Sequence, residues 1–107
     1  MPVYEKLIRD RIPEIIEASG KKAITRVLGD EEFQREARKK LHEELAEYEA
    51  AKNDRESLEE LADLLELIHA LAECHGATME ELEKIRRDKL SKRGGFDRKL
   101  FLVEVTD

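Results

Sequence analysis

The sequence predicts a mainly α-helical fold, a compact domain of four helices covering residues 1–107. Charged residues make up 43% of the 107-residue chain and aromatic residues only 5%, a composition typical of charge-decorated helices rather than of a β-sandwich. Two prolines and five glycines leave long stretches uninterrupted. Apolar residues recur there at three- and four-residue intervals, which is the period of an amphipathic helix.

The first helix is predicted over residues 12–18, with Asp10 near its N-cap, Pro13 in its first turn and Ser19-Gly20 at its end. Two further segments, 23–28 and 100–105, are short, apolar and partly alternating. Their pattern allows a minor two-stranded β element in which the two segments pair.

A long amphipathic helix is predicted from Asp30 to about Lys52, because this stretch contains neither glycine nor proline. Its apolar residues fall within one sector when projected at about 100° per residue. These residues are Phe33, Ala37, Leu41, Tyr48 and Ala51, with Leu45 at the rim of the sector.

The next helix is predicted from Ser57 to about His75, because Ser57 and Glu60 have the spacing of a capping box. It is apolar over most of its circumference, so we expect it to be central and largely buried. Cys74, the only cysteine, lies in this run and is expected to be a buried thiol. A third long helix should begin at Thr78, whose partner in a second capping box is Glu81, and end near Gly94-Gly95.

Two pairs of acidic residues break the amphipathic pattern of the two central helices. Glu44 projects within the apolar sector of its helix and Glu47 at its edge, whereas Glu43 points away. On the next helix Glu60 projects among leucines, with Asp63 beside it. If the turn at residues 53–56 makes the helices antiparallel, the two pairs converge.

An ionised carboxylate among apolar side chains is unfavourable unless it takes up a proton or finds cations. Four converging carboxylates offer the hard oxygen ligands that Mg²⁺ or Mn²⁺ prefers, so we predict a metal site. The predicted ligands are Glu44, Glu47, Glu60 and Asp63. The competing explanation is that each acid pairs with Lys or Arg on a solvated helix face, as most glutamates do.

Charge and cysteine content narrow the classes of function. The net charge of −6 disfavours nucleic-acid binding, which normally needs an excess of Lys and Arg on one face. A single cysteine excludes an intramolecular disulfide and fits a reducing cytoplasm, and no apolar run suggests a signal peptide or a membrane span. A domain of this size has a limited core, so we expect a homodimer or homotetramer.

The acidic pattern resembles a known family signature. Residues 43–47, Glu-Glu-Leu-Ala-Glu, and residues 60–63, Glu-Leu-Ala-Asp, are similar to the EExxE and ExxD motifs of the all-α, MazG-like nucleoside triphosphate pyrophosphohydrolases. The opening residues 4–13 and the closing residues 92–96, Lys-Arg-Gly-Gly-Phe, resemble the phosphoribosyl-ATP pyrophosphohydrolase-like subgroup.

The resemblance implies Mg²⁺-dependent cleavage between the α and β phosphates of a nucleotide, giving a monophosphate and pyrophosphate. The substrate would be an NTP or dNTP in a house-cleaning role, or phosphoribosyl-ATP. We interpret Glu47 as the candidate general base. Five basic residues are candidates for binding substrate phosphates, namely Lys6, Arg9, Lys89, Lys92 and Arg93.

Two non-enzymatic alternatives stay open at this point. The acidic patch could dock a basic partner as a helical interaction module that binds no metal, or it could mimic nucleic acid toward a basic protein. Both predict no metal binding and no release of pyrophosphate, so metal titration and a nucleotide panel separate them from the enzyme.

Overall fold

The computed structural model describes residues 4–107, which form four helices and, within that range, no strand. The helices are α1 (Ile12–Ala18), α2 (Asp30–Ala50), α3 (Asp54–Cys74) and α4 (Met79–Arg93). The predicted mainly α class and its four helices are therefore confirmed.

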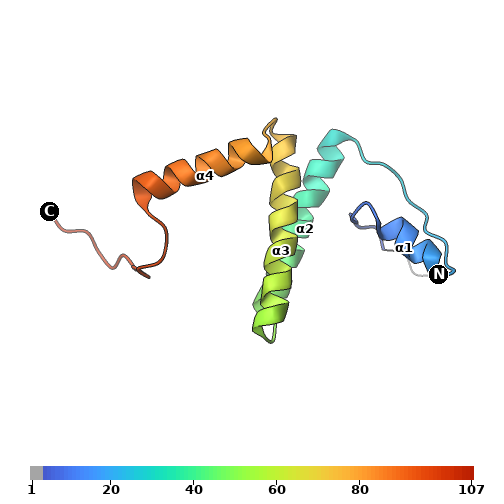
Figure 1. The fold of residues 1–107 in the computed structure, drawn as a ribbon, viewed down its shortest axis with the longest axis horizontal. Coiled ribbons are helices and arrows are strands. Elements are labelled where there is room, and N and C mark those ends of the chain that lie inside the picture. Colours follow the sequence, from blue (N-terminus) through green and yellow to red (C-terminus); the bar gives the residue numbers. More distant parts are fainter. Residues whose placement is uncertain (1–3) are drawn as a thin grey trace.

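The centre of the structure is a hairpin of α2 and α3, which contact each other along antiparallel axes (Figure 1). Residues 51–53 connect them at one end. α4 contacts α3 and leads away from the opposite end of the hairpin, while α1 lies on the other side and contacts no other described helix. The chain measures 65 × 36 × 22 Å along its principal axes. The packed seam between α2 and α3 is thus the main tertiary contact.

The start of α2 follows from its sequence. Gly29 occupies the N-cap with an extended backbone and no side-chain cap, and three acids in the first turn complement the positive end of the helix dipole. Further along α2, Ala37 is fully buried, and among the described residues it is the only buried apolar side chain. Because alanine is small, it lets a neighbouring helix approach closely at this point.

The start of α3 differs from the prediction. Ser57 is not its N-cap. Asn53 is, and its side chain accepts a hydrogen bond of 2.8 Å from the backbone N–H of Glu56. The Glu56 carboxylate in turn accepts from the backbone N–H of Lys52 at 3.0 Å. Asn53 and Glu56 thus satisfy N–H groups at the helix start, and Glu60 is left free to face α2.

The predicted β element is not formed in residues 4–107. Segment 23–28 links α1 to α2, whereas segment 100–105 lies beyond the far end of α4 on the other side of the hairpin (Figure 1). Ile24 and Phe101 are accordingly about 90% exposed. Two segments kept apart by α4 cannot form a ladder within one chain, so the prediction of pairing was wrong for the single chain.

The expectation that α3 is largely buried is also wrong for the single chain. Only α2 packs along its length, so one apolar face remains open. Its exposed residues are Leu58, Leu61, Leu65 and Ile68, with exposed fractions of 60%, 44%, 53% and 41%. Despite this apolar content, none of the described helices is long and apolar enough to cross a membrane.

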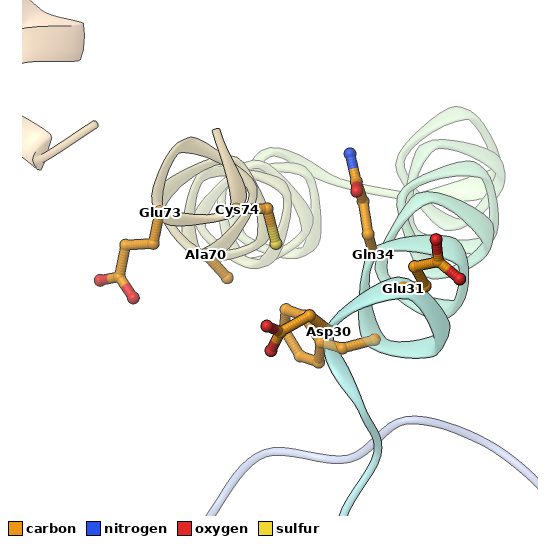
Figure 2. Close-up of a pocket in the computed structure, with 7 residues that line it drawn as sticks. Asp30, Glu31, Gln34, Ala70, Glu73 and Cys74 are labelled. Carbon is orange, nitrogen blue, oxygen red and sulfur yellow. The ribbon is translucent and has the colours of Figure 1, made fainter. Parts of the chain in front are cut away.

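Cys74 is exposed rather than buried. It lines a cleft where the end of α3 meets the start of α2, together with Asp30, Gln34 and Glu73 (Figure 2). Residues 69–72 of α3 are half-buried, and exposure begins at Glu73, next to Cys74.

The last helix follows its prediction closely. Thr78 caps α4, accepting a hydrogen bond of 3.1 Å from the backbone N–H of Glu81. Gly94 ends the helix with a φ of 80°, a left-handed conformation that glycine adopts without steric cost. The stop is therefore local in origin and directs residues 95–107 away from the hairpin.

The observed cap gives a test of how α3 begins. Asn53→Ala should lower the free energy of unfolding by about 1 kcal/mol, because an N–H of the first turn loses its acceptor. Urea denaturation followed by circular dichroism measures this. Ser57→Ala is the matched control and should lower the free energy of unfolding clearly less. If Ser57→Ala were the more destabilising of the two, Ser57 rather than Asn53 would be the N-cap.

Candidate metal centre

Three glutamates from the two central helices converge at the α2–α3 seam. Glu44 and Glu47 come from α2 and Glu60 from α3, and each offers one carboxylate oxygen such that the three lie within 4.8 Å of one another. Oxygens bound to one Mg²⁺ are at most about 4.2 Å apart, given metal–oxygen distances near 2.1 Å. Small side-chain rotations would therefore bring all three onto a single cation.

The local helix geometry selects which acids meet. Glu44 is only 8% exposed, because it points from α2 into the seam. Glu43, one position earlier, is exposed, and so is Glu59, which pairs with Arg55 at 3.2 Å on the solvent side of α3. A helix rotates about 100° per residue, so neighbours in sequence face different environments.

Two buried oxygens within this cluster lack a hydrogen-bond partner among the described residues, namely Oε2 of Glu44 and Oε2 of Glu60. A buried carboxylate oxygen without a donor is costly and rare in folded proteins. A divalent cation, or a proton shared between the two carboxyls, would satisfy these oxygens. The residues present therefore fit a hard metal ion on the evidence of their donor atoms and of these orphaned oxygens.

The clustering shifts the pKa values of Glu44 and Glu60. Burial, followed by hydrogen bonding to Glu60 and Glu47 and the charges of Glu47 and Asp63, raises the pKa of Glu44 to about 7. A hydrogen bond with Glu44 lowers the pKa of Glu60, but burial and the neighbouring acids outweigh it and the net direction is upward. Without a cation the pair therefore holds a proton near neutral pH.

Asp63, the fourth predicted ligand, lies beside the three glutamates but is engaged differently. Its Oδ1 accepts a hydrogen bond of 2.6 Å from the guanidinium of Arg9, in the segment before α1. The structure thus brings one of the five basic candidates to the carboxylates. Its charge still acts on the cluster, because Asp63 contributes to the raised pKa of both Glu44 and Glu60.

The other basic candidates lie elsewhere in the single chain. Lys6 sits over the ring of Tyr4, with its Nζ 5.4 Å from the ring centroid. Lys89, Lys92 and Arg93 occupy the last turns of α4, which leads away from the hairpin (Figure 1). In that position Lys92 and Arg93 complement the negative end of the α4 dipole.

Sequence reasoning missed one cation at the cluster. The Nζ of Lys40 lies 3.9 Å from Oε1 of Glu44, and the Lys40 side chain is only 21% exposed. The signal was present, because Lys40 precedes Glu44 by four residues and such pairs share a helix face. Lys40 offsets part of the acidic charge but leaves the other oxygen of Glu44 unpartnered.

The raised pKa of Glu44 predicts how stability depends on pH when metal is absent. The folded state holds a proton that the unfolded chain, with the ordinary value of 4.5, releases. This contribution is fully present below about pH 4.5 and is lost as pH rises through about 7. We expect the free energy of unfolding of wild type, measured by urea denaturation in EDTA, to fall by about 1–3 kcal/mol relative to that of Glu44→Gln between pH 5 and 8. Parallel pH profiles for the two proteins would contradict the assignment.

Comparison with known proteins gives one short match. No family model and no solved structure matches the chain. A stretch of 46 residues is 50% identical to an uncharacterized protein of Mycolicibacterium smegmatis, covering 43% of this chain. The matched stretch spans about half of that relative, 47% of its length, and its name describes no activity.

Proposed function

We propose that this protein is a Mg²⁺-dependent nucleotide pyrophosphohydrolase that cleaves the bond between the α and β phosphates and releases pyrophosphate. The observation that carries the proposal is the convergence of Glu44, Glu47 and Glu60 with two buried oxygens that no described donor satisfies. The resemblance of residues 43–47 and 60–63 to the pyrophosphohydrolase motifs supplies the reaction. Mn²⁺ suits the same oxygen ligands.

The carboxylates divide by burial into two roles. Glu44 and Glu60, the less exposed glutamates, would hold the metal together with one oxygen of Glu47. Asp63 would offer the oxygen that Arg9 does not use. When bound, the metal supplies charge neutralisation at the phosphates and acidifies a coordinated water. Phosphoryl transfer needs little covalent chemistry from the protein, so positioning and charge are its main contributions.

Glu47 fits the general base better than its neighbours. It is the exposed member of the three glutamates, so a water molecule can reach its carboxylate from solvent. The seam holds Glu44 with 8% exposure, where a base would lack such access. Glu47 would accept the proton of the attacking water as the water adds to phosphorus.

The first test is pyrophosphate release from a panel of NTPs, dNTPs, damaged nucleotides and phosphoribosyl-ATP in the presence of Mg²⁺. We expect turnover on at least one member, abolished by EDTA. Glu47→Gln should lower kcat by about 10²–10⁴-fold, which is the usual contribution of a general base. The panel also separates the house-cleaning role from the phosphoribosyl-ATP role.

Matched controls lie one residue from the proposed ligands. Glu43→Gln and Glu59→Gln remove the same charge from the solvent side of the same helices and should leave turnover unchanged. If wild type binds neither Mg²⁺ nor Mn²⁺ and releases no pyrophosphate across the panel, the enzyme proposal fails. The acidic interaction module, which needs no metal, would then account for the carboxylates.

We further propose, as part of this function, that a second copy covers the open face of α3 in a cytoplasmic homodimer or homotetramer. The exposed stripe of Leu58, Leu61, Leu65 and Ile68 supports this, because monomeric proteins rarely leave a contiguous apolar patch open. A second copy could also bring the basic end of α4 toward a neighbouring carboxylate cluster.

Light scattering tests the assembly. We expect a mass two or four times the 12.4 kDa of the chain. Leu65→Glu should shift the mass toward the monomer, because it places a charge in the apolar stripe. A wild-type mass of one chain at high concentration would contradict this part of the proposal.

A further inference from the structure

One ion pair differs in kind from all others in the described chain. The remaining pairs join residues three to six positions apart and decorate helix surfaces or a neighbouring turn. Arg9 and Asp63 are 54 positions apart and connect the segment before α1 to the carboxylate cluster on α3. Because exposed ion pairs contribute about 0–1 kcal/mol, stability alone gives little reason for this one.

We propose that Arg9 is a substrate-binding residue, held beside the metal centre by Asp63 so that its free N–H groups bind the β and γ phosphates of a nucleotide. This inference rests on the proposed function. Of the five basic residues predicted to bind substrate phosphates, it assigns to Arg9 a protein partner, Asp63, and the phosphates that it binds.

The ion pair with Asp63 leaves most of the N–H donors of Arg9 unused. A guanidinium carries five N–H groups, and the contact with Asp63 uses one nitrogen and one carboxylate oxygen. The Arg9 side chain is 56% exposed, so its remaining edge faces solvent, where a phosphate can approach. Arginine recognises phosphate through two parallel N–H donors, and the donors of Arg9 suffice for such a contact beside the one to Asp63.

The charges around Arg9 explain why the arrangement suits a polyphosphate. Four carboxylates would repel an incoming nucleotide if no cation stood among them. Lys40 is turned into the seam toward Glu44, with a side chain only 21% exposed, so it is poorly placed to meet a ligand from solvent. Arg9, with a side chain 56% exposed, is accessible to a ligand, and Asp63 limits the rotamers that Arg9 must lose on binding.

The backbone of Arg9 makes a local hydrogen bond at the start of α1. The carbonyl of Arg9 accepts a hydrogen bond of 3.1 Å from the backbone N–H of Ile12, the first residue of α1. The backbone of Arg9 is therefore fixed to a helix start while its side chain reaches α3. A bound nucleotide would add a third attachment and order this segment further.

The test measures binding rather than turnover, by calorimetry with wild type, Arg9→Gln, Arg9→Lys and Arg11→Gln. Arg11 is the matched control, because it lies in the same segment but pairs with Glu14 within α1. The probes are Mn²⁺ alone, then a non-hydrolysable α,β-methylene triphosphate and the corresponding monophosphate in the presence of Mn²⁺.

We expect Arg9→Gln to bind Mn²⁺ within about threefold of wild type while its Kd for the triphosphate rises about 10- to 100-fold, which is typical of losing a hydrogen bond between charged groups. The monophosphate, which lacks the β and γ phosphates, should be affected much less. The Kd of Arg9→Lys for the triphosphate should lie between those of wild type and Arg9→Gln, because lysine keeps the positive charge but lacks the two parallel N–H donors of a guanidinium. Arg11→Gln should match wild type.

Three results overturn the inference, and they are distinguishable. If wild type binds Mn²⁺ and the triphosphate and Arg9→Gln binds both equally well, Arg9 has no role in substrate binding and the proposed function stands. If wild type binds neither probe, the proposed function fails and the inference falls with it. An equal loss of triphosphate and monophosphate binding in Arg9→Gln would indicate a structural role and also contradict the inference.

Discussion

The seam between α2 and α3 places the carboxylate of Glu44 against that of Glu60, and much of the rest of the structure can be understood from this contact. Burial of Glu44, its hydrogen bonding to Glu60 and Glu47 and the charges of the neighbouring acids raise the pKa of Glu44 to about 7. The total stability of a domain is about 5–15 kcal/mol, so a penalty of this kind is substantial. Helix packing that forces these groups together is explained if a metal ion occupies the space between their oxygens.

Other parts of the structure determine how close α2 and α3 approach and which side chains meet between them. Ala37, fully buried, allows close approach of the helices, and the cap at Asn53 sets where α3 begins and hence where Glu60 points. The segment before α1 reaches the site through the contact of Arg9 with Asp63. The outer face of α3 does not contact α2 and is apolar, which fits an assembly in which a second chain covers it.

Helical periodicity correctly predicted the directions of the acidic side chains on α2 and α3. A rotation of about 100° per residue distinguishes Glu44 from Glu43 and Glu60 from Glu59, and the structure places all four as that rotation predicts. The caps at Thr78 and Gly94 were also readable, because a capping box and a glycine stop act within a few residues.

Features that depend on distant parts of the chain were not readable in the same way. The β-branched composition of residues 23–28 predicts a strand, but a strand needs a partner, and α4 carries residues 100–105 away. The start of α3 was misplaced because Ser57 and Asn53 both precede an acid by three residues, and local pattern does not rank them. The contact of Arg9 with Asp63 spans 54 positions, and only the fold reveals it.

Counting the protons released when Mn²⁺ binds tests whether a divalent cation occupies the carboxylate cluster of α2 and α3. Calorimetric titrations at pH 6.5 in buffers of different ionisation enthalpy give this number. Because the pKa of Glu44 is raised to about 7, the metal-free site is largely protonated at that pH, and the account predicts release of a substantial fraction of one proton per site. Glu44→Gln should release far less. Saturable Mn²⁺ binding with no proton release, or no binding at all, would contradict the account.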